Sequence, residues 1–72
     1  MELDLITRRG CHLCDDAEQL LLGAGHSVRS LDVDADPELL RLYDFRVPVV
    51  LFEGRVIAEG RIKPEALAAL RP

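Results

Sequence analysis

The sequence predicts an α/β fold whose elements follow the order β-α-β-α-β-β-α, with a four-stranded mixed sheet and helices on both of its faces. Short apolar runs alternate along the chain with segments whose apolar residues recur at helical spacing. Two later apolar runs are separated only by Glu53 and Gly54, a pair that suits a tight hairpin. A strand, a crossover helix and a parallel strand, followed by a hairpin and a helix, can pack as one such sheet.

The first half of the chain predicts a strand, a helix and a second strand. The first strand is expected over residues 3–6, before a turn at residues 8–10. The first helix begins at His12, and its apolar residues recur at i, i+4, i+7 and i+8 from Leu13 until glycines end it at residues 23–25. The second strand is expected to contain Val28, Leu31 and Val33.

The second half predicts a helix, a hairpin and a final helix. Residues 36–38, Asp-Pro-Glu, supply an N-cap, a proline at the first helical position and an acidic first turn. The helix that follows carries Tyr43 and several leucines, which we expect in the core. Strands over residues 47–52 and 55–58 should be antiparallel neighbours. A last helix should begin near Pro64. Its apolar stripe should contain Ile62, Ala66, Leu67 and Leu70.

Length and composition predict one domain over residues 1–72. With 49% hydrophobic and 31% charged residues, the composition is globular. The net charge is -4 and the basic residues are scattered, which argues against a nucleic-acid partner. The longest apolar run, residues 47–52, is too short to span a bilayer, and the N-terminus lacks the basic region of a signal peptide. We therefore expect no membrane association and a cytoplasmic location.

The chain has two cysteines, Cys11 and Cys14, which form a Cys-X-X-Cys pair. A disulfide between them would close a loop of roughly four residues, which stabilises a fold far less than a longer loop does. In a reducing cytosol such a pair is more often catalytic or metal-binding than a permanent bridge. The function of the chain therefore depends on what these two thiols do.

Cys11 falls between the expected first strand and the first helix, a position that favours its thiolate. The backbone N–H groups and the positive dipole end of a helix stabilise an anion there, and Arg8 and Arg9 add positive charge. Cys14 lies three residues further along the same side of the helix. It can therefore reach a mixed disulfide at Cys11 and release the bound thiol. The spacing predicts a two-step disulfide reduction.

Other polar residues have simpler interpretations. His12, between the cysteines, would stabilise a neighbouring thiolate if it were partly protonated, and is otherwise a solvated spacer. His26 is expected as a solvated loop residue. The acidic stretch at residues 32–36 lacks the glycine and distal glutamate of a calcium loop, so we interpret it as a cap.

Two segments resemble the glutaredoxin-like branch of the thioredoxin superfamily. They are Thr-Arg-Arg-Gly-Cys-His-Leu-Cys at residues 7–14 and Arg-Val-Pro at residues 46–48. The resemblance covers essentially the whole chain. It implies a minimal thioredoxin fold and a small dithiol oxidoreductase of electron transport, which reduces disulfides or mixed disulfides through its Cys-X-X-Cys pair.

The resemblance also implies roles for individual residues. Cys11 would be the nucleophile and Cys14 the resolving thiol, and Pro48 would be a cis-proline that faces them. The backbone of Val47 would pair with a bound peptide or glutathione, and Arg8 matches a basic residue of the family that contacts glutathione. The candidate substrate-binding residues are Arg8, His12, Val47, Pro48 and Gly60.

The implied partners are a disulfide-containing protein or a low-molecular-weight thiol, with a reductase or glutathione as electron donor. No metal and no bound cofactor is expected, and glutathione would act as a co-substrate. Glutaredoxins carry Gly-Gly and paired aspartates where residues 59–62 are Glu-Gly-Arg-Ile, and Cys-Pro-Tyr-Cys where this chain has Cys-His-Leu-Cys. Thioredoxins carry a tryptophan where Gly10 stands and a buried acid where Leu5 stands. The chain is thus intermediate between the two families, and both electron donors stay open.

A different class of function could use the same cysteines. Small copper chaperones also place Cys-X-X-Cys between a first strand and a first helix, although their order is β-α-β-β-α-β. The chain would then bind a soft metal or an iron–sulfur cluster. Because Cys11, Cys14 and His26 supply three ligands at best, a four-ligand site would require a dimer. An adaptor that binds partners without chemistry is a third alternative, which the two cysteines disfavour.

Overall fold

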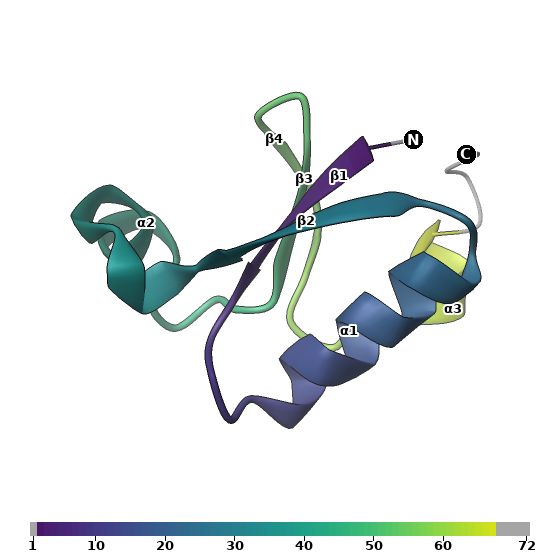
Figure 1. Cartoon of the computed structure of the whole chain (residues 1–72), viewed down its shortest axis with the longest axis horizontal. Coiled ribbons are helices and arrows are strands. Elements are labelled where there is room, and N and C mark those ends of the chain that lie inside the picture. The colour runs from purple at the N-terminus through teal and green to yellow at the C-terminus, as the bar shows by residue number, and fades with distance from the viewer. Residues whose placement is uncertain (1, 68–72) are drawn as a thin grey trace.

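The computed structural model describes residues 2–67, and its elements follow the predicted order with one addition, a short 3-10 helix labelled η1 (Figure 1). In chain order the elements are β1 (Glu2–Thr7), α1 (His12–Gly23), β2 (Ser27–Asp32), η1 (Val33–Ala35), α2 (Pro37–Tyr43), β3 (Val49–Phe52), β4 (Arg55–Glu59) and α3 (Pro64–Leu67). Leu70, which the sequence assigns to the last helix, lies outside the described residues.

The four strands form one mixed sheet in the order β2-β1-β3-β4. β1 pairs with β2 in parallel and with β3 in antiparallel orientation. β3 and β4 are antiparallel neighbours, as predicted, with an irregularity between Val50 and Leu51. Glu53 and Gly54, which join them, have φ angles of 51° and 81°. Positive φ at both central residues is the conformation of a type I′ hairpin turn.

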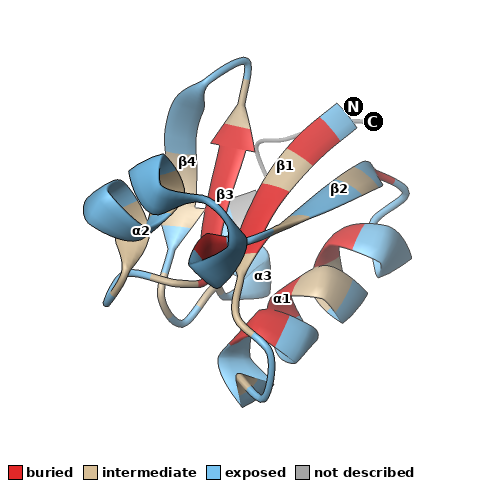
Figure 2. Ribbon diagram, turned by 60° about the vertical axis from the view of Figure 1, so that its left-hand side comes forward, coloured by how far each residue is buried: buried red, intermediate tan, exposed pale blue. Residues whose placement is uncertain are grey.

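Helices cover both faces of the sheet, as the sequence predicts (Figures 1 and 2). Successive strand residues point to opposite faces, so each strand contributes to two cores. The core on the α1 face contains Leu3, Leu5, Ala17, Leu21 and Val50. The core on the α2 face contains Ile6, Val33, Val49 and Leu51, with Leu39 and Tyr43 of α2 packed against it. Figure 2 shows the burial concentrated in β1, β3 and the inner side of α1.

The end of α1 explains why His26 is buried, whereas the sequence analysis expected it in solvent. The N–H of Gly25 donates to the carbonyl of Leu22 at 3.0 Å, and the N–H of His26 donates to the carbonyl of Leu21 at 3.2 Å. These are the two bonds of a Schellman motif, in which glycine takes a positive φ and the next residue packs back on the helix. Gly25 has φ 90°, and His26 is only 4% exposed. The expectation for His26 was wrong.

Two predicted strand boundaries were also wrong. Val33 is fully buried but does not belong to β2. The carboxylate of Asp32 accepts a hydrogen bond from the N–H of Asp34 at 2.9 Å, which turns the chain into η1 instead of continuing the strand. The third strand begins at Val49, two residues later than predicted, because Pro48 has no N–H to donate to the sheet.

Part of the expected core of α2 is on the surface. α2 has only seven residues, so one narrow side of it contacts the sheet. Leu39 and Tyr43, four residues apart, lie on that side and are half-buried, whereas Leu40 and Leu42 are exposed.

In α1, Leu13 and Leu22 are exposed. The buried stripe of α1 is therefore formed by Cys14, Ala17 and Leu21.

The described part of the last helix begins at Pro64, as predicted. Ile62, which precedes it, packs against the core on the α1 face, but Ala66 is exposed and does not extend that stripe.

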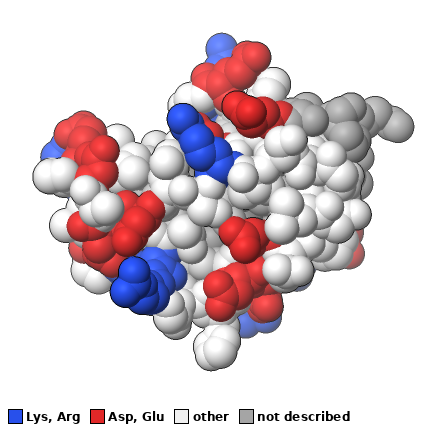
Figure 3. Space-filling view, viewed as in Figure 1, with Lys and Arg blue, Asp and Glu red and all other residues white. Residues whose placement is uncertain are grey.

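On the face drawn in Figure 3, basic side chains are scattered among acidic ones. Between residues 2 and 67 no helix has the length and hydropathy needed to cross a membrane.

Asp36 caps α2, as the sequence predicts. Its carboxylate accepts hydrogen bonds from the N–H of Glu38 at 2.8 Å and of Leu39 at 3.4 Å. These bonds satisfy N–H groups that have no partner inside the helix.

Asp36→Ala removes this cap and should lower the free energy of unfolding by about 1 kcal/mol. Asp36→Asn keeps an acceptor at the same position and should lose much less. Urea unfolding of both variants measures the difference as a shift of the midpoint at constant slope. Asp16→Ala, at an exposed position of α1, is the control. Equal losses for Asp36→Ala and Asp36→Asn would contradict the capping role.

Candidate active site

Three chain segments meet at one edge of the sheet. The register of β1 and β3 places Ile6 opposite Val49, so Pro48 lies beside the end of β1. The register of β3 and β4 places Val49 opposite Glu59. Just beyond that pair, the N–H of Gly60 donates to the carbonyl of Pro48 at 2.8 Å. The loop after β1, the segment before β3 and the end of β4 are therefore neighbours.

Cys11 lies between β1 and α1 and is the N-cap of the helix. Its backbone is extended, and its Sγ accepts a hydrogen bond from the N–H of Cys14 at 3.2 Å. Its carbonyl accepts the first helical bond, from Asp15 at 3.1 Å. The helix start therefore offers the Cys11 sulfur a hydrogen-bond donor at the positive end of the helix dipole. Cys11 as a residue is half-buried.

Cys14 is more deeply buried than Cys11, and its pKa is raised. It is 1% exposed, in the buried stripe of α1. Burial raises the pKa of the Cys14 thiol and the neighbouring Cys11 raises it further, while contacts with the Thr7 side chain and the Arg8 backbone lower it. Because the balance is upward from an already alkaline value, Cys14 stays protonated at neutral pH. The two sulfurs are therefore chemically unequal.

Arg8 connects the loop before Cys11 to the opposite layer of the fold. Its Nε and Nη2 donate to the two carboxylate oxygens of Asp34, both at 2.9 Å. Its Nη2 also donates to Oδ1 of Asp44 at 2.7 Å, and its Nη1 donates to the carbonyl of Asp44 at 3.1 Å. All three guanidinium nitrogens are thus engaged. Four of its five N–H groups are used in this way, which leaves one N–H of Nη1 for a substrate carboxylate.

Arg46 holds the segment before β3 in a similar way. Its Nε donates to Oε2 of Glu59 at 2.7 Å, and its Nη1 donates to the carbonyl of Leu42 at 3.3 Å. Its guanidinium also lies over the ring of Tyr43, 5.2 Å from the centroid. The residue that precedes Val47 is therefore tied to both α2 and β4.

The structure brings the other candidate residues to the same edge of the sheet. The Val47-Pro48 peptide bond is cis. The Val47 side chain packs against the core on the α2 face. Outside the helices and strands of residues 2–67, no backbone–backbone hydrogen bond involves Val47. Gly60 has a positive φ of 71°, and His12 is exposed in the first turn of α1.

The residues that position this site lie far apart in the sequence. Asp34 and Asp44 are 26 and 36 residues from Arg8, and Arg46 is 13 residues from Glu59. The cap interpretation of residues 32–36 holds for Asp32 and Asp36, but Asp34 binds Arg8 instead. No local pattern in the sequence connects these charges, because the fold alone brings them together.

The chemistry available at this edge is that of two thiols. Within residues 2–67, no group of three or more histidine, cysteine, aspartate or glutamate side chains is arranged to hold a metal ion. A half-buried sulfur at a helix start, with a buried thiol one turn behind it, can attack a disulfide and then resolve the product.

The mixed sheet, the helices on its two faces and the Cys-X-X-Cys at the start of α1 define a thioredoxin-like protein of the minimal type. The model of the family "Glutaredoxin-like domain (DUF836)" matches residues 2–70, and the chain belongs to this family. The family and the two neighbouring cysteines together indicate a role in thiol redox chemistry.

Two solved structures are similar to this chain. The X-ray structure of the Northeast Structural Genomics target protein XcR50 from X. campestris has 35% sequence identity and a TM-score of 0.81, and the match covers 93% of this chain and 91% of that one. A structure described as that of a malarial protein has 18% identity and a TM-score of 0.55, over 96% and 90% of the two chains. The second likeness concerns the fold alone. No curated protein matches the chain.

The bonds between Arg8 and Asp34 predict an acid-sensitive contribution to stability. Hydrogen bonds from Arg8 hold the pKa of Asp34 below its ordinary value, which is about 3.9 for aspartate. The contribution is therefore complete above the ordinary value and is lost as the pH falls through the lowered folded-state value. Arg8→Leu should be less stable than the wild type at pH 7, and the difference should shrink below about pH 4.

Urea midpoints of the wild type and Arg8→Leu between neutral pH and pH 3 measure this difference. Arg9→Leu, which changes an exposed neighbouring arginine, is the matched control and should show no such trend. A difference for Arg8→Leu that stays constant down to pH 3 would refute the electrostatic explanation.

Proposed function

We propose that the chain is a small single-domain dithiol oxidoreductase that reduces disulfides or mixed disulfides through Cys11 and Cys14. The observation that carries the proposal is the 3.2 Å hydrogen bond from the Cys14 N–H to the Cys11 Sγ. It places one half-buried sulfur at the start of α1 and the other, buried thiol directly behind it. Membership of the glutaredoxin-like family supports the same chemistry.

The reaction proceeds in two exchanges. The Cys11 thiolate attacks one sulfur of the substrate disulfide, that S–S bond breaks, and the first substrate thiolate leaves and takes a proton. Cys14 then loses its proton and attacks the Cys11 sulfur, which releases the second substrate thiolate. The products are two substrate thiols and a Cys11–Cys14 disulfide, so two electrons pass from the protein to the substrate.

The unequal environments of the two sulfurs support this order of events. Because the pKa of Cys14 is raised by burial, Cys14 does not compete with Cys11 for the first attack. Once Cys11 is bound to substrate, its charge no longer opposes ionisation of Cys14, and the resolving thiolate forms more easily. The segment Val47-Pro48 lies at the same edge of the sheet and would hold the substrate backbone.

A reducing partner must restore the dithiol after each cycle. Glutathione with its reductase and thioredoxin reductase are the two donors to test in parallel, with the same disulfide substrate. A cytoplasmic location would suit this cycle, because a reducing compartment keeps such a pair as free thiols between turnovers.

Cys11→Ser should abolish disulfide reduction without unfolding the chain, because serine is also a good N-cap. Cys14→Ser should still react once and then stop, with substrate bound at Cys11. Single-turnover release of 2-nitro-5-thiobenzoate from a mixed disulfide, followed by mass spectrometry of the protein, measures both effects. Circular dichroism confirms that each variant is folded. Full turnover by Cys11→Ser would overturn the mechanism.

A further inference from the structure

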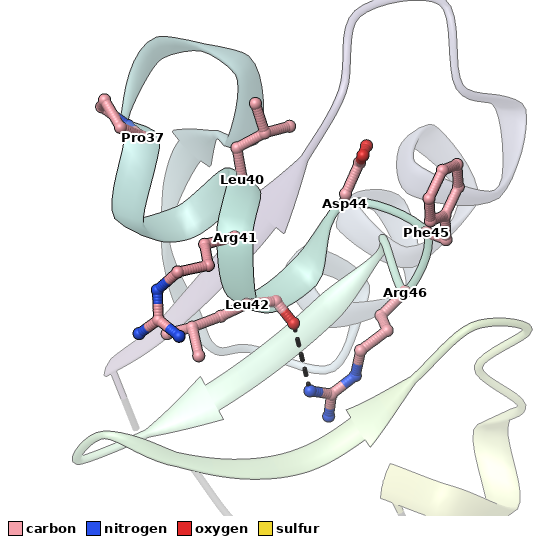
Figure 4. A pocket seen from close by; sticks show the side chains of 7 residues that line it. All are labelled: Pro37, Leu40, Arg41, Leu42, Asp44, Phe45 and Arg46. Atoms are coloured by element: carbon pink, nitrogen blue, oxygen red, sulfur yellow. Dashed lines mark hydrogen bonds between the residues drawn. The ribbon is translucent and has the colours of Figure 1, made fainter.

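The outer side of α2 and the loop after it form an open groove with a volume of about 520 Å³ (Figure 4). Its apolar lining comes from Pro37, Leu40, Leu42 and Phe45. Phe45 is 95% exposed, and it lies at the end of the groove away from Pro37. Single exposed apolar residues are ordinary on a protein surface, but apolar residues that line one groove offer a surface on which an apolar segment can pack.

The charges of this groove are already neutralised within the chain. Its three charged residues, Arg41, Asp44 and Arg46, each bond to an opposite charge outside the groove. Their partners are Glu38, Arg8 and Glu59, respectively. Because these charges are already paired within the chain, an occupant does not have to supply an opposite charge. The groove therefore matches an apolar segment.

One end of the groove lies near the candidate active site. Phe45 precedes Pro48 by three residues, so their Cα atoms lie within about 11 Å of each other. Asp44, next to Phe45, is bonded to Arg8, which lies three residues before Cys11. An extended polypeptide advances about 3.3 to 3.6 Å per residue. A polypeptide held at Val47-Pro48 can therefore reach Phe45 with a residue about two or three positions from its reacting cysteine.

We propose that this groove docks an apolar segment of a protein substrate that flanks the disulfide attacked by Cys11. The inference rests on the proposed function and adds to it a class of substrate, because a disulfide without flanking residues cannot reach Phe45. Arg8 is less available to a small anionic thiol peptide, since its bonds to Asp34 and Asp44 use four of its five N–H groups. Phe45 is then a specificity-determining residue and Cys11 remains the nucleophile.

The test uses chromogenic mixed disulfides of 2-nitro-5-thiobenzoate with pre-reduced protein. Three heptapeptides carry leucine, serine or aspartate at the second and third positions on both sides of a central cysteine. The fourth compound carries 2-mercaptoethanol and has no flanking residues. Release of 2-nitro-5-thiobenzoate gives a second-order rate constant for each. The variants are Phe45→Ala, Phe45→Leu and the matched control Leu22→Ala, which truncates an exposed leucine of α1.

The wild type should react with the leucine peptide about tenfold faster than with the serine peptide, and more slowly still with the aspartate peptide. Phe45→Ala should remove most of that preference and leave the 2-mercaptoethanol compound within about twofold of the wild type. Phe45→Leu should restore part of the preference, and Leu22→Ala should match the wild type.

Two results would overturn the docking proposal. One is a wild-type preference that Phe45→Ala leaves unchanged, or no preference at all. The other is a dimer that equilibrium sedimentation detects and that Phe45→Ala dissociates, which would assign the groove to a second copy of the chain. Failure of the proposed function is distinguishable, because Cys11→Ser would then react with the 2-mercaptoethanol compound as fast as the wild type.

Discussion

Ile6 of β1 pairs with Val49 of β3, and this antiparallel register places Pro48 beside the loop that carries the cysteines. β1 is flanked by strands on both sides, so its register is fixed by two ladders and by the two cores that it separates. A shift by one residue would exchange the faces of every side chain on a strand. Ile6 and Val49 would leave the α2 face, and the three segments at the sheet edge would no longer meet. The geometry of the candidate site is thus a consequence of strand pairing in the core.

The order of the elements could be predicted because it is encoded locally. Asp36 before Pro37 predicts a helix start, and Glu53-Gly54 predicts a hairpin, each through bonds or φ angles within a few residues. The predictions failed where a side chain or a glycine redirects the backbone. Asp32 diverts the chain before Val33, and the Schellman turn returns His26 to the core. The spacing of apolar residues carries no information about these local hydrogen bonds.

In the candidate site, too, the local features could be predicted and the long-range contacts could not. The position of Cys11 at a helix start could be predicted, because strand, turn and helix follow each other along the chain. The carboxylates that bind Arg8 could not, because strand pairing brings them there from more than twenty residues away. The exposure of Phe45 also escaped prediction, because it depends on how α2 sits on the sheet and not on the residue type. Tertiary packing therefore determines what surrounds the cysteines.

The sulfur of Cys11 both caps α1 and carries the proposed redox chemistry. A thiolate and a disulfide sulfur accept hydrogen bonds with different strengths. If the pair cycles as proposed, the first turn of α1 would therefore differ in stability between the reduced and oxidised proteins. By thermodynamic reciprocity, the same free energy appears in the reduction potential of the pair. A residue that stabilises or destabilises the start of α1 in only the reduced or only the oxidised protein therefore also changes the reduction potential. In such a protein, the free energy of capping α1 is also part of the free energy of reducing the disulfide.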